Sequence, residues 1–156
     1  MSWKEKAIMA HILIIEDNAD HQIIFGRFLE CAGHQTIGAA TGAVGLICAQ
    51  QQIPDLIMLD LRLHDMVGWD VARALKSDPR TQHIPVLILT AEPLAREVLA
   101  TPTFGCDAIL LKPFMTDVFL DTITRLLTLH PPRPSREPAT TPPHAPPSEL
   151  LHMLHP

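Results

Sequence analysis

The sequence has few cysteines, no excess of basic residues and no long hydrophobic run, and each absence argues against a class of protein. Its three cysteines are odd in number and form no C-x-x-C pair, which argues against a disulfide framework or a zinc site and favours a reducing compartment. The formal net charge of −5 leaves no basic surface for nucleic acid. The apolar run near the N-terminus is too short for a signal peptide or membrane span. We therefore expect a cytoplasmic protein that binds neither nucleic acid nor membrane.

The 156 residues are enough for one domain of ordinary size. The composition changes after His130, where PPRPSREPATTPPHAPP begins, and a segment this rich in proline cannot form a packed core. We divide the chain into an N-terminal extension at residues 1–9, a domain at residues 10–130 and a proline-rich, disordered tail at residues 131–156. Deletion of that tail is expected to leave the domain folded.

Within the domain, short apolar runs alternate with segments of helical length. The runs that we predict as strands are HILIIED, TIGAA, DLIMLD, PVLILTA and AILLK. The predicted helices span residues 20–33, 41–52 and 68–77, a weaker segment from Pro93, and residues 115–130. The runs are continuously apolar, which indicates strands buried on both faces, as in a parallel sheet between two helix layers. The predicted fold class is α/β, a doubly wound five-stranded parallel sheet.

Two of these helices carry more detailed predictions. The first has an apolar face formed by Ile24, Phe25, Phe28 and Leu29, and Gly33 can adopt the left-handed conformation that ends a helix. Gly26 inside it is either required by a close contact or tolerated at a cost of about 1 kcal/mol. The last helix has a wider apolar arc, formed by Val118, Phe119, Leu120, Ile123, Leu126, Leu127 and Leu129. Part of this arc is either a partner or homodimer face, or a surface covered by the fourth helix or the tail.

Polar residues stand at the carboxyl ends of the predicted strands, where open parallel sheets bind their ligands. They are Glu16 and Asp17, Asp60, Thr90, and Lys112. Taken alone, each is best interpreted as an ordinary polar strand end, but together they suggest a site. Three carboxylates repel one another, yet they are the oxygen ligands that Mg²⁺ prefers, and a hydroxyl and an ammonium can bind a phosphate-sized anion beside the ion. Asp60 is then a candidate nucleophile, because aspartyl phosphates are established covalent intermediates.

Four segments in this order resemble the receiver domains of the two-component response-regulator family, over roughly residues 10–130. They are ILIIEDN, LIMLDLRLHDMVGWD with its Gly68, LTA at Thr90 and Ala91, and LLKPF at Lys112. The resemblance implies a flavodoxin-like, CheY-like fold with strand order 2-1-3-4-5. It also implies that Asp60 accepts a phosphoryl group from a sensor histidine kinase or a histidine phosphotransfer protein.

The same resemblance implies roles for the neighbouring residues. Mg²⁺ would be held by Glu16, Asp17, Asp60 and the backbone carbonyl of Arg62, and the phosphoryl group would be bound by Thr90, the Ala91 N–H and Lys112. The protein would not be an enzyme acting on other substrates, since only phosphotransfer to the domain and its slow dephosphorylation are expected. Because no second globular segment follows the domain, we expect the signal to pass to a downstream protein partner.

Several residues depart from the family pattern or modify it. His64 stands where the family usually has proline, and Ile109 replaces the Tyr or Phe whose rotation reports phosphorylation in many receivers. Pro102 interrupts the fourth helix. These departures favour an alternative, a receiver-fold binding module that acts largely independently of phosphorylation. A phosphatase with an aspartyl nucleophile is a third option, but Arg62 occupies the place of its second aspartate. The resemblance also implies that Arg62 and Glu92 flank the path of water to the phosphoryl group. These two residues carry opposite charges and can pair.

Overall fold

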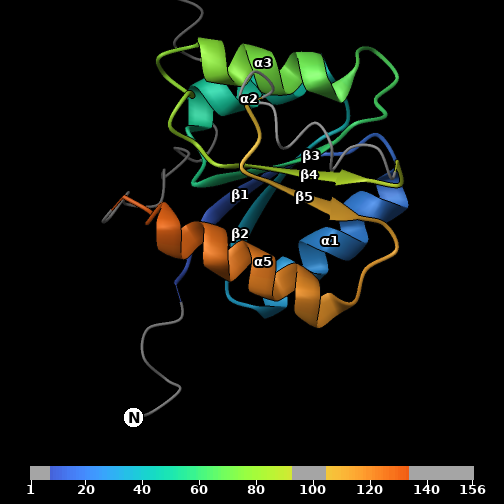
Figure 1. The fold of residues 1–156 in the computed structure, drawn as a ribbon, viewed down its shortest axis with the longest axis vertical. Coiled ribbons are helices and arrows are strands. Elements are labelled where there is room, and N and C mark those ends of the chain that lie inside the picture. Colours follow the sequence, from blue (N-terminus) through green and yellow to red (C-terminus); the bar gives the residue numbers. More distant parts are fainter. Residues whose placement is uncertain (1–7, 93–104, 134–156) are drawn as a thin grey trace, which may run out of the picture.

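The computed structural model describes residues 8–92 and 105–133, which form five strands and four helices (Figure 1). In chain order these are β1 (His11–Ile15), α1 (Ala19–Cys31), β2 (Gln35–Ala39), α2 (Gly42–Gln52), β3 (Leu56–Asp60), α3 (Gly68–Ser77), β4 (Val86–Thr90), β5 (Ala108–Leu111) and α5 (Thr116–Leu129). The predicted fourth helix from Pro93, with Pro102, lies outside the described residues, as do most of the N-terminal extension and the tail from residue 134 onward. None of the described helices combines the length and apolarity needed to cross a membrane.

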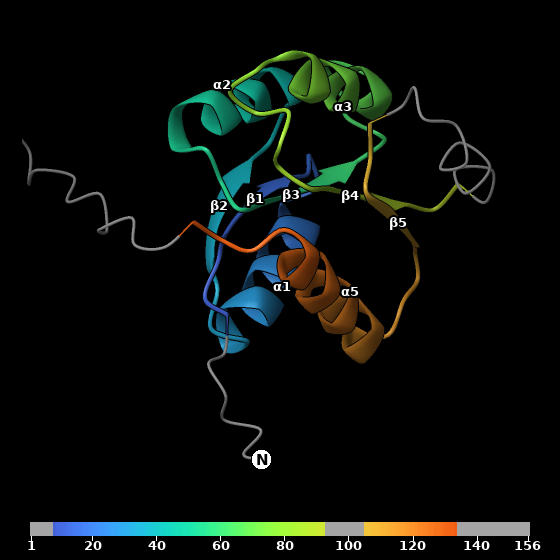
Figure 2. The ribbon, with the colours of Figure 1, turned by 60° about the vertical axis from the view of Figure 1, so that its left-hand side comes forward.

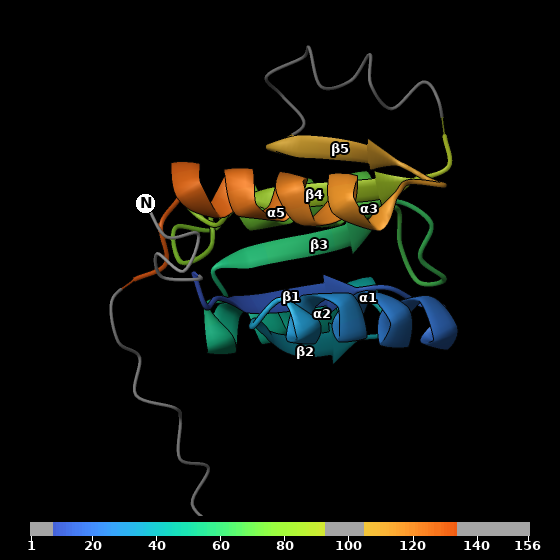
Figure 3. The same cartoon turned by 90° about the horizontal axis from the view of Figure 1, so that it is seen from below.

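All five strands are parallel and follow the order β2-β1-β3-β4-β5. Seen from below, their arrowheads point in one direction and reach the same edge of the sheet (Figure 3). β3 and β4 are buried along their whole length, as strands covered on both faces must be. The predicted fold class and strand order are therefore confirmed.

Helices cover both faces of the sheet, with α1 and α5 on one side and α2 and α3 on the other (Figure 2). Because side chains alternate along a strand, β1 contributes to both cores: Ile12 and Ile14 face α1 and α5, and Leu13 and Ile15 face α2 and α3. The sheet is thus held between two apolar layers, which leaves its carboxyl edge for polar side chains.

Side chains cap the first two helices at the edge where the strands end. The Asn18 carboxamide oxygen accepts a hydrogen bond from His21 N–H at 3.1 Å, and the Thr41 hydroxyl accepts one from Val44 N–H at 3.1 Å. α1 therefore begins directly after the acidic pair that follows β1. At its other end Gly33 adopts a φ of 94°, so the predicted left-handed residue is confirmed.

The predicted apolar face of α1 is correct for three residues and wrong for one. Phe25 and Leu29 are buried and Phe28 packs partly against the same core, but Ile24 is 46% exposed because it lies at the margin of the stripe. Gly26 is also buried, next to Thr36 and Ile14 of the sheet. A Cβ there would meet its nearest neighbours at 3.7 Å or more, an ordinary contact, so this glycine is tolerated rather than required.

The wide apolar arc of α5 divides into a buried and an exposed part. Its buried residues are Phe119, Ile123, Leu126 and Leu127, whereas Val118 and Leu129 are exposed. Among the described residues, then, packing on the sheet accounts for only the central part of the arc.

Candidate functional site

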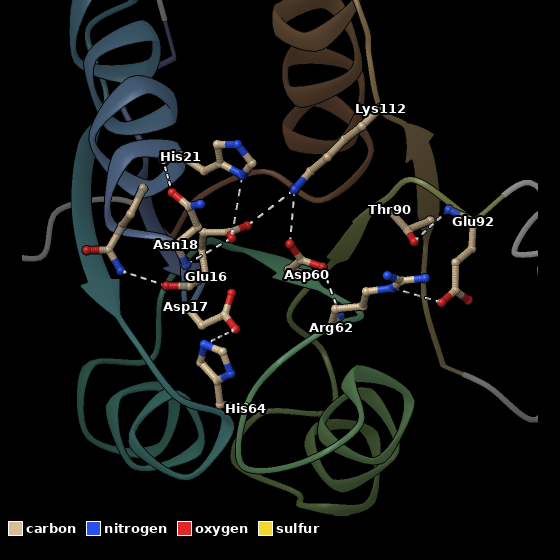
Figure 4. A network of polar contacts seen from close by, with 11 residues as sticks. Glu16, Asp17, Asn18, His21, Asp60, Arg62, His64, Thr90, Glu92 and Lys112 are labelled. Atoms are coloured by element: carbon tan, nitrogen blue, oxygen red, sulfur yellow. Dashed lines mark hydrogen bonds and ion pairs between the residues drawn. The ribbon is translucent and has the colours of Figure 1, made fainter.

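The polar residues singled out in the sequence meet at the carboxyl edge of the sheet (Figure 4). Glu16 and Asp17 follow β1, Asp60 is the last residue of β3, Thr90 is the last residue of β4, and Lys112 follows β5. Carboxylate oxygens of Glu16, Asp17 and Asp60 all lie within 4.8 Å of one another. Strand order explains this proximity, because β1 and β3 are adjacent, as are β3 and β4.

Asp60 is buried and both of its oxygens are hydrogen-bonded. Oδ1 accepts from the Arg62 backbone N–H at 2.9 Å, and Oδ2 accepts from Lys112 Nζ at 3.0 Å. The same Lys112 ammonium lies 3.5 Å from Glu16 Oε2 and 5.6 Å from the centre of the Phe25 ring. The Lys112–Pro113 peptide bond is cis. One cation therefore stands between two carboxylates, with an aromatic face beside it.

The two carboxyl groups beside Lys112 differ in their affinity for protons. Glu16 is only 2% exposed, and burial, together with the hydrogen bond and the charge of Asp60, raises its pKa to about 7. For Asp60, burial alone would raise the pKa, but the hydrogen bonds from Glu16, the Arg62 N–H and Lys112 outweigh burial and lower it. Near neutral pH the pair therefore carries a proton on Glu16 for part of the time, while Asp60 is ionised.

Thr90 and Lys112 are joined through the backbone, because Lys112 N–H donates to the Thr90 carbonyl oxygen at 2.8 Å. The buried Thr90 hydroxyl accepts a hydrogen bond from Glu92 N–H at 3.1 Å, and Ala91 between them is exposed. In front of the strand ends, Arg62 Nε lies 3.3 Å from Glu92 Oε1, with side chains 80% and 47% exposed. The predicted pairing of Arg62 with Glu92 is confirmed.

Three residues that contact the acidic cluster were not predicted from the sequence. His64 Nε2 lies 3.1 Å from Asp17 Oδ2, and His21 Nδ1 lies 3.7 Å from Glu16 Oε1. Asn18 N–H donates to Glu16 Oε1 at 3.2 Å. Asn18 follows the acidic pair directly and is a typical helix-capping residue, which was a usable signal. The histidine contacts depend on loop geometry, for which hydrophobic periodicity gives no signal.

The donor set suits a hard divalent cation. The three carboxyl groups outnumber the single lysine beside them, which leaves an excess of negative charge. Carboxylate oxygens are also the ligands that Mg²⁺ prefers. Thr90 lies on the side of Asp60 away from Glu16 and Asp17, and the ammonium of Lys112 lies between Asp60 and Glu16, where both can reach an anion bound at Asp60 (Figure 4). An anion bound there would meet hydrogen-bond donors rather than carboxylates.

Comparison with known families gives a match that spans residues 12–124, to the response regulator receiver domain. The chain belongs to this receiver-domain family. Among its relatives is the polar-differentiation response regulator DivK of Brucella ovis, which is 33% identical over 116 residues, covering 74% of this chain and 94% of DivK. The chain is thus a homologue of proteins of two-component signalling.

Solved structures show the same relationship. The chemotaxis response regulator CheY4 of Vibrio cholerae superposes with a TM-score of 0.71 at 28% identity, covering 76% of this chain and 99% of CheY4. The receiver domain of a sensor histidine kinase from Pseudomonas aeruginosa superposes with a TM-score of 0.70 at 25% identity, covering 77% of this chain and 98% of that domain. That structure contains a magnesium ion coordinated in the active site cleft. The fold therefore hosts Mg²⁺ in a structural neighbour.

Proposed function

We propose that the protein accepts a phosphoryl group on Asp60 from a sensor histidine kinase or a histidine phosphotransfer protein, and signals through a protein partner in two-component signal transduction. The observation that carries this proposal is the position of Asp60, a buried carboxylate within 4.8 Å of two others and 3.0 Å from Lys112 Nζ. A carboxylate that served only to end a strand would not need two further acids beside it. The cysteine content is in keeping with a cytoplasmic site of action.

In the proposed reaction, an Asp60 carboxylate oxygen forms a bond to the phosphorus of a phosphohistidine. The P–N bond breaks, its electron pair returns to the imidazole, and that nitrogen then takes up a proton from solvent. The product is an acyl phosphate on Asp60. Hydrogen bonds from Glu16, the Arg62 N–H and Lys112 outweigh the effect of burial and hold the pKa of Asp60 below its ordinary value, so the attacking group is ionised at neutral pH.

The neighbouring residues have complementary roles in the proposal. Glu16, Asp17, Asp60 and the backbone carbonyl of Arg62 would hold Mg²⁺, which supplies positive charge to neutralise the phosphoryl oxygens. Lys112 releases its contact with Asp60 and donates to a phosphoryl oxygen instead. Thr90 accepts from Glu92 N–H with its oxygen and has its own proton to donate, and the Ala91 N–H is a further donor.

The test is incorporation of one phosphoryl group, detected by intact mass after incubation with Mg²⁺ and a small phosphodonor such as phosphoramidate. We expect an adduct on the wild type that is absent with chelator and absent in Asp60→Asn. Asp70→Asn, which neutralises an exposed acid on α3, is the matched control and should be phosphorylated normally. Adduct formation at the wild-type rate in Asp60→Asn would refute the assignment of the acceptor.

A second candidate function is protein binding that is largely independent of phosphorylation, and Ile109 favours it. Its side chain is partly buried and packs against the α2 and α3 core, where an aliphatic group has no hydroxyl or ring to rotate toward Thr90. The two candidates differ in what phosphorylation changes. Hydrogen exchange of β5 and α5 that responds to the phosphodonor supports the first, and a phosphorylated protein with unchanged exchange there supports the second.

A further inference from the structure

The loop that follows Asp60 is closed at its base. This acceptor loop, residues 61–67, connects β3 to α3, and the Gly68 N–H donates to the Leu61 carbonyl oxygen at 2.9 Å. Arg62 and Val67 also form an antiparallel bridge across it. The base therefore has a fixed geometry, and the remaining freedom of the loop lies at its tip.

At the tip, the Asp65 carboxylate is bound to the first turn of α2. Its Oδ1 accepts from Gly42 N–H at 2.9 Å and its Oδ2 from Ala43 N–H at 3.0 Å. These bonds lower the pKa of Asp65, as expected for a carboxylate that accepts backbone N–H groups at a helix N-terminus. Thr41 already caps this helix through Val44, so Asp65 is a second cap that comes from a distant part of the chain.

His64, the residue before Asp65, contacts the end of β1 instead of α2. His64 Nε2 lies 3.1 Å from Asp17 Oδ2, with the Asp17 side chain 15% exposed beneath a His64 side chain that is 87% exposed. His64 is not among the residues whose ligand atoms cluster within 4.8 Å, so it contacts a proposed ligand from outside the metal position (Figure 4). Two consecutive residues thus join the tip of the acceptor loop to the end of β1 and to the start of α2.

We propose that His64 and Asp65 are positioning residues that hold the acceptor loop across the strand ends and so preset Asp17 and the Arg62 carbonyl for the metal. This inference rests on the proposed metal site. Partners that orient metal-bound carboxylates from outside commonly change metal affinity by about 10- to 100-fold when they are removed. Neither residue is proline, so no ring restricts the backbone here and the side-chain contacts restrict it instead.

The first arm of the test needs no metal. Arg62 is exposed within the acceptor loop, so trypsin can report how often the loop opens, through the fragment that ends at Arg62. In metal-free protein we expect Asp65→Ala to be cut there several times faster than wild type. Asp65→Asn retains a carbonyl acceptor and should be intermediate. Asp70→Ala removes an equal charge without touching the loop and should match wild type, and circular dichroism verifies that each variant is folded.

The second arm measures Mg²⁺ affinity by titration calorimetry. We expect Asp65→Ala to weaken Mg²⁺ binding by roughly tenfold, the lower end of the range for outer partners, and His64→Ala to weaken it by a smaller factor. Unchanged cleavage and unchanged affinity in Asp65→Ala would overturn the inference, and tighter Mg²⁺ binding by His64→Ala would overturn the role of His64. Absence of Mg²⁺ binding by the wild type would instead overturn the proposed function, while the proteolysis arm still tests the contact of Asp65 with α2.

Discussion

Replacement of Glu16 by glutamine should stabilise the metal-free protein. Glu16 is buried beside Asp60, and its pKa of about 7 in the folded chain stands above the ordinary value of 4.5. A raised pKa in an acid means that its contribution to stability is fully present below pH 4.5 and is lost as the pH rises through about 7. The difference between the two values corresponds to about 3 kcal/mol. Ionised Glu16 therefore opposes folding at pH 8, and a neutral isostere removes that opposition.

The expected gain at pH 8 is about 1 to 3 kcal/mol. The gain should be smaller than the full value of about 3 kcal/mol that the pKa difference allows. Glu16 accepts hydrogen bonds from Asn18 N–H and Lys112 Nζ, whereas glutamine has only one acceptor oxygen for both. At pH 5 folded wild type carries a protonated, neutral Glu16, so the variant should gain little there. The pH dependence of the gain, more than its size, distinguishes charge from packing.

The assay is urea unfolding with chelator at pH 5 and pH 8, followed by melting with and without Mg²⁺. A ligand at about 100 times its dissociation constant adds about 2.7 kcal/mol, so Mg²⁺ should stabilise wild type and should stabilise Glu16→Gln much less. Glu30→Gln, at an exposed position on α1, is the charge-matched control. A metal-free Glu16→Gln protein that is no more stable than wild type at pH 8, or that gains equally at pH 5, would refute the electrostatic argument.

Three further predictions concern the mouth of the site, a buried histidine and two glycines. We expect the ion pair of Arg62 with Glu92 to obstruct the approach of water, so Arg62→Ala should shorten the lifetime of the phosphorylated protein severalfold without changing Mg²⁺ affinity. Equal or slower decay of the adduct after donor removal would contradict this. Burial lowers the pKa of His34 below its ordinary value of 6.5, so the stability that the neutral side chain contributes is present above pH 6.5 and is lost as the pH falls below it. The urea midpoint of His34→Asn, relative to that of wild type, should therefore rise as the pH falls from 7 to 5. A difference that stays constant with pH would contradict this. Gly68→Ala places a Cβ 2.6 Å from the Asp60 carbonyl oxygen and from Leu61 Cα, and it should lower the free energy of unfolding by about 1 to 3 kcal/mol. Gly26→Ala meets only ordinary contacts and should be neutral or stabilising by up to about 1 kcal/mol; equal melting temperatures of the two variants would refute the difference.

The sequence allowed prediction of the sheet and of the polar residues at its carboxyl edge, because both follow from the pattern of buried residues. Strands that are covered by helices on both faces are continuously apolar, so a carboxylate or ammonium marks the end of the buried part of the strand. Asp60 and Lys112 were located in this way, and parallel topology then brings such strand ends to one edge. The position of each residue along its own strand was enough to predict that these residues lie at one edge of the sheet, without knowledge of any side-chain contact.

Other features depend on contacts between distant parts of the chain. Ile24 was predicted to face the core because it is apolar, but a stripe on α1 is only as wide as the sheet beneath it, and its centre is occupied by Gly26. Ile53, the residue that follows α2, has a φ of 44°, a conformation that a β-branched residue rarely adopts and that no local sequence pattern predicts. The contact of Asp65 with α2 likewise spans more than 20 residues of sequence.

The electrostatics of the site connect these observations to function. A domain selected only for stability would not bury Glu16 beside Asp60, since the pair raises the pKa of one carboxyl and holds a proton that solvent would otherwise take. Lys112 compensates for one negative charge, and the remaining excess makes the metal-free edge unfavourable. We expect the positive charge of a bound divalent cation to offset that excess and to displace the proton from Glu16, so metal binding and folding would be coupled. The same excess of negative charge would attract the cation before any phosphodonor arrives.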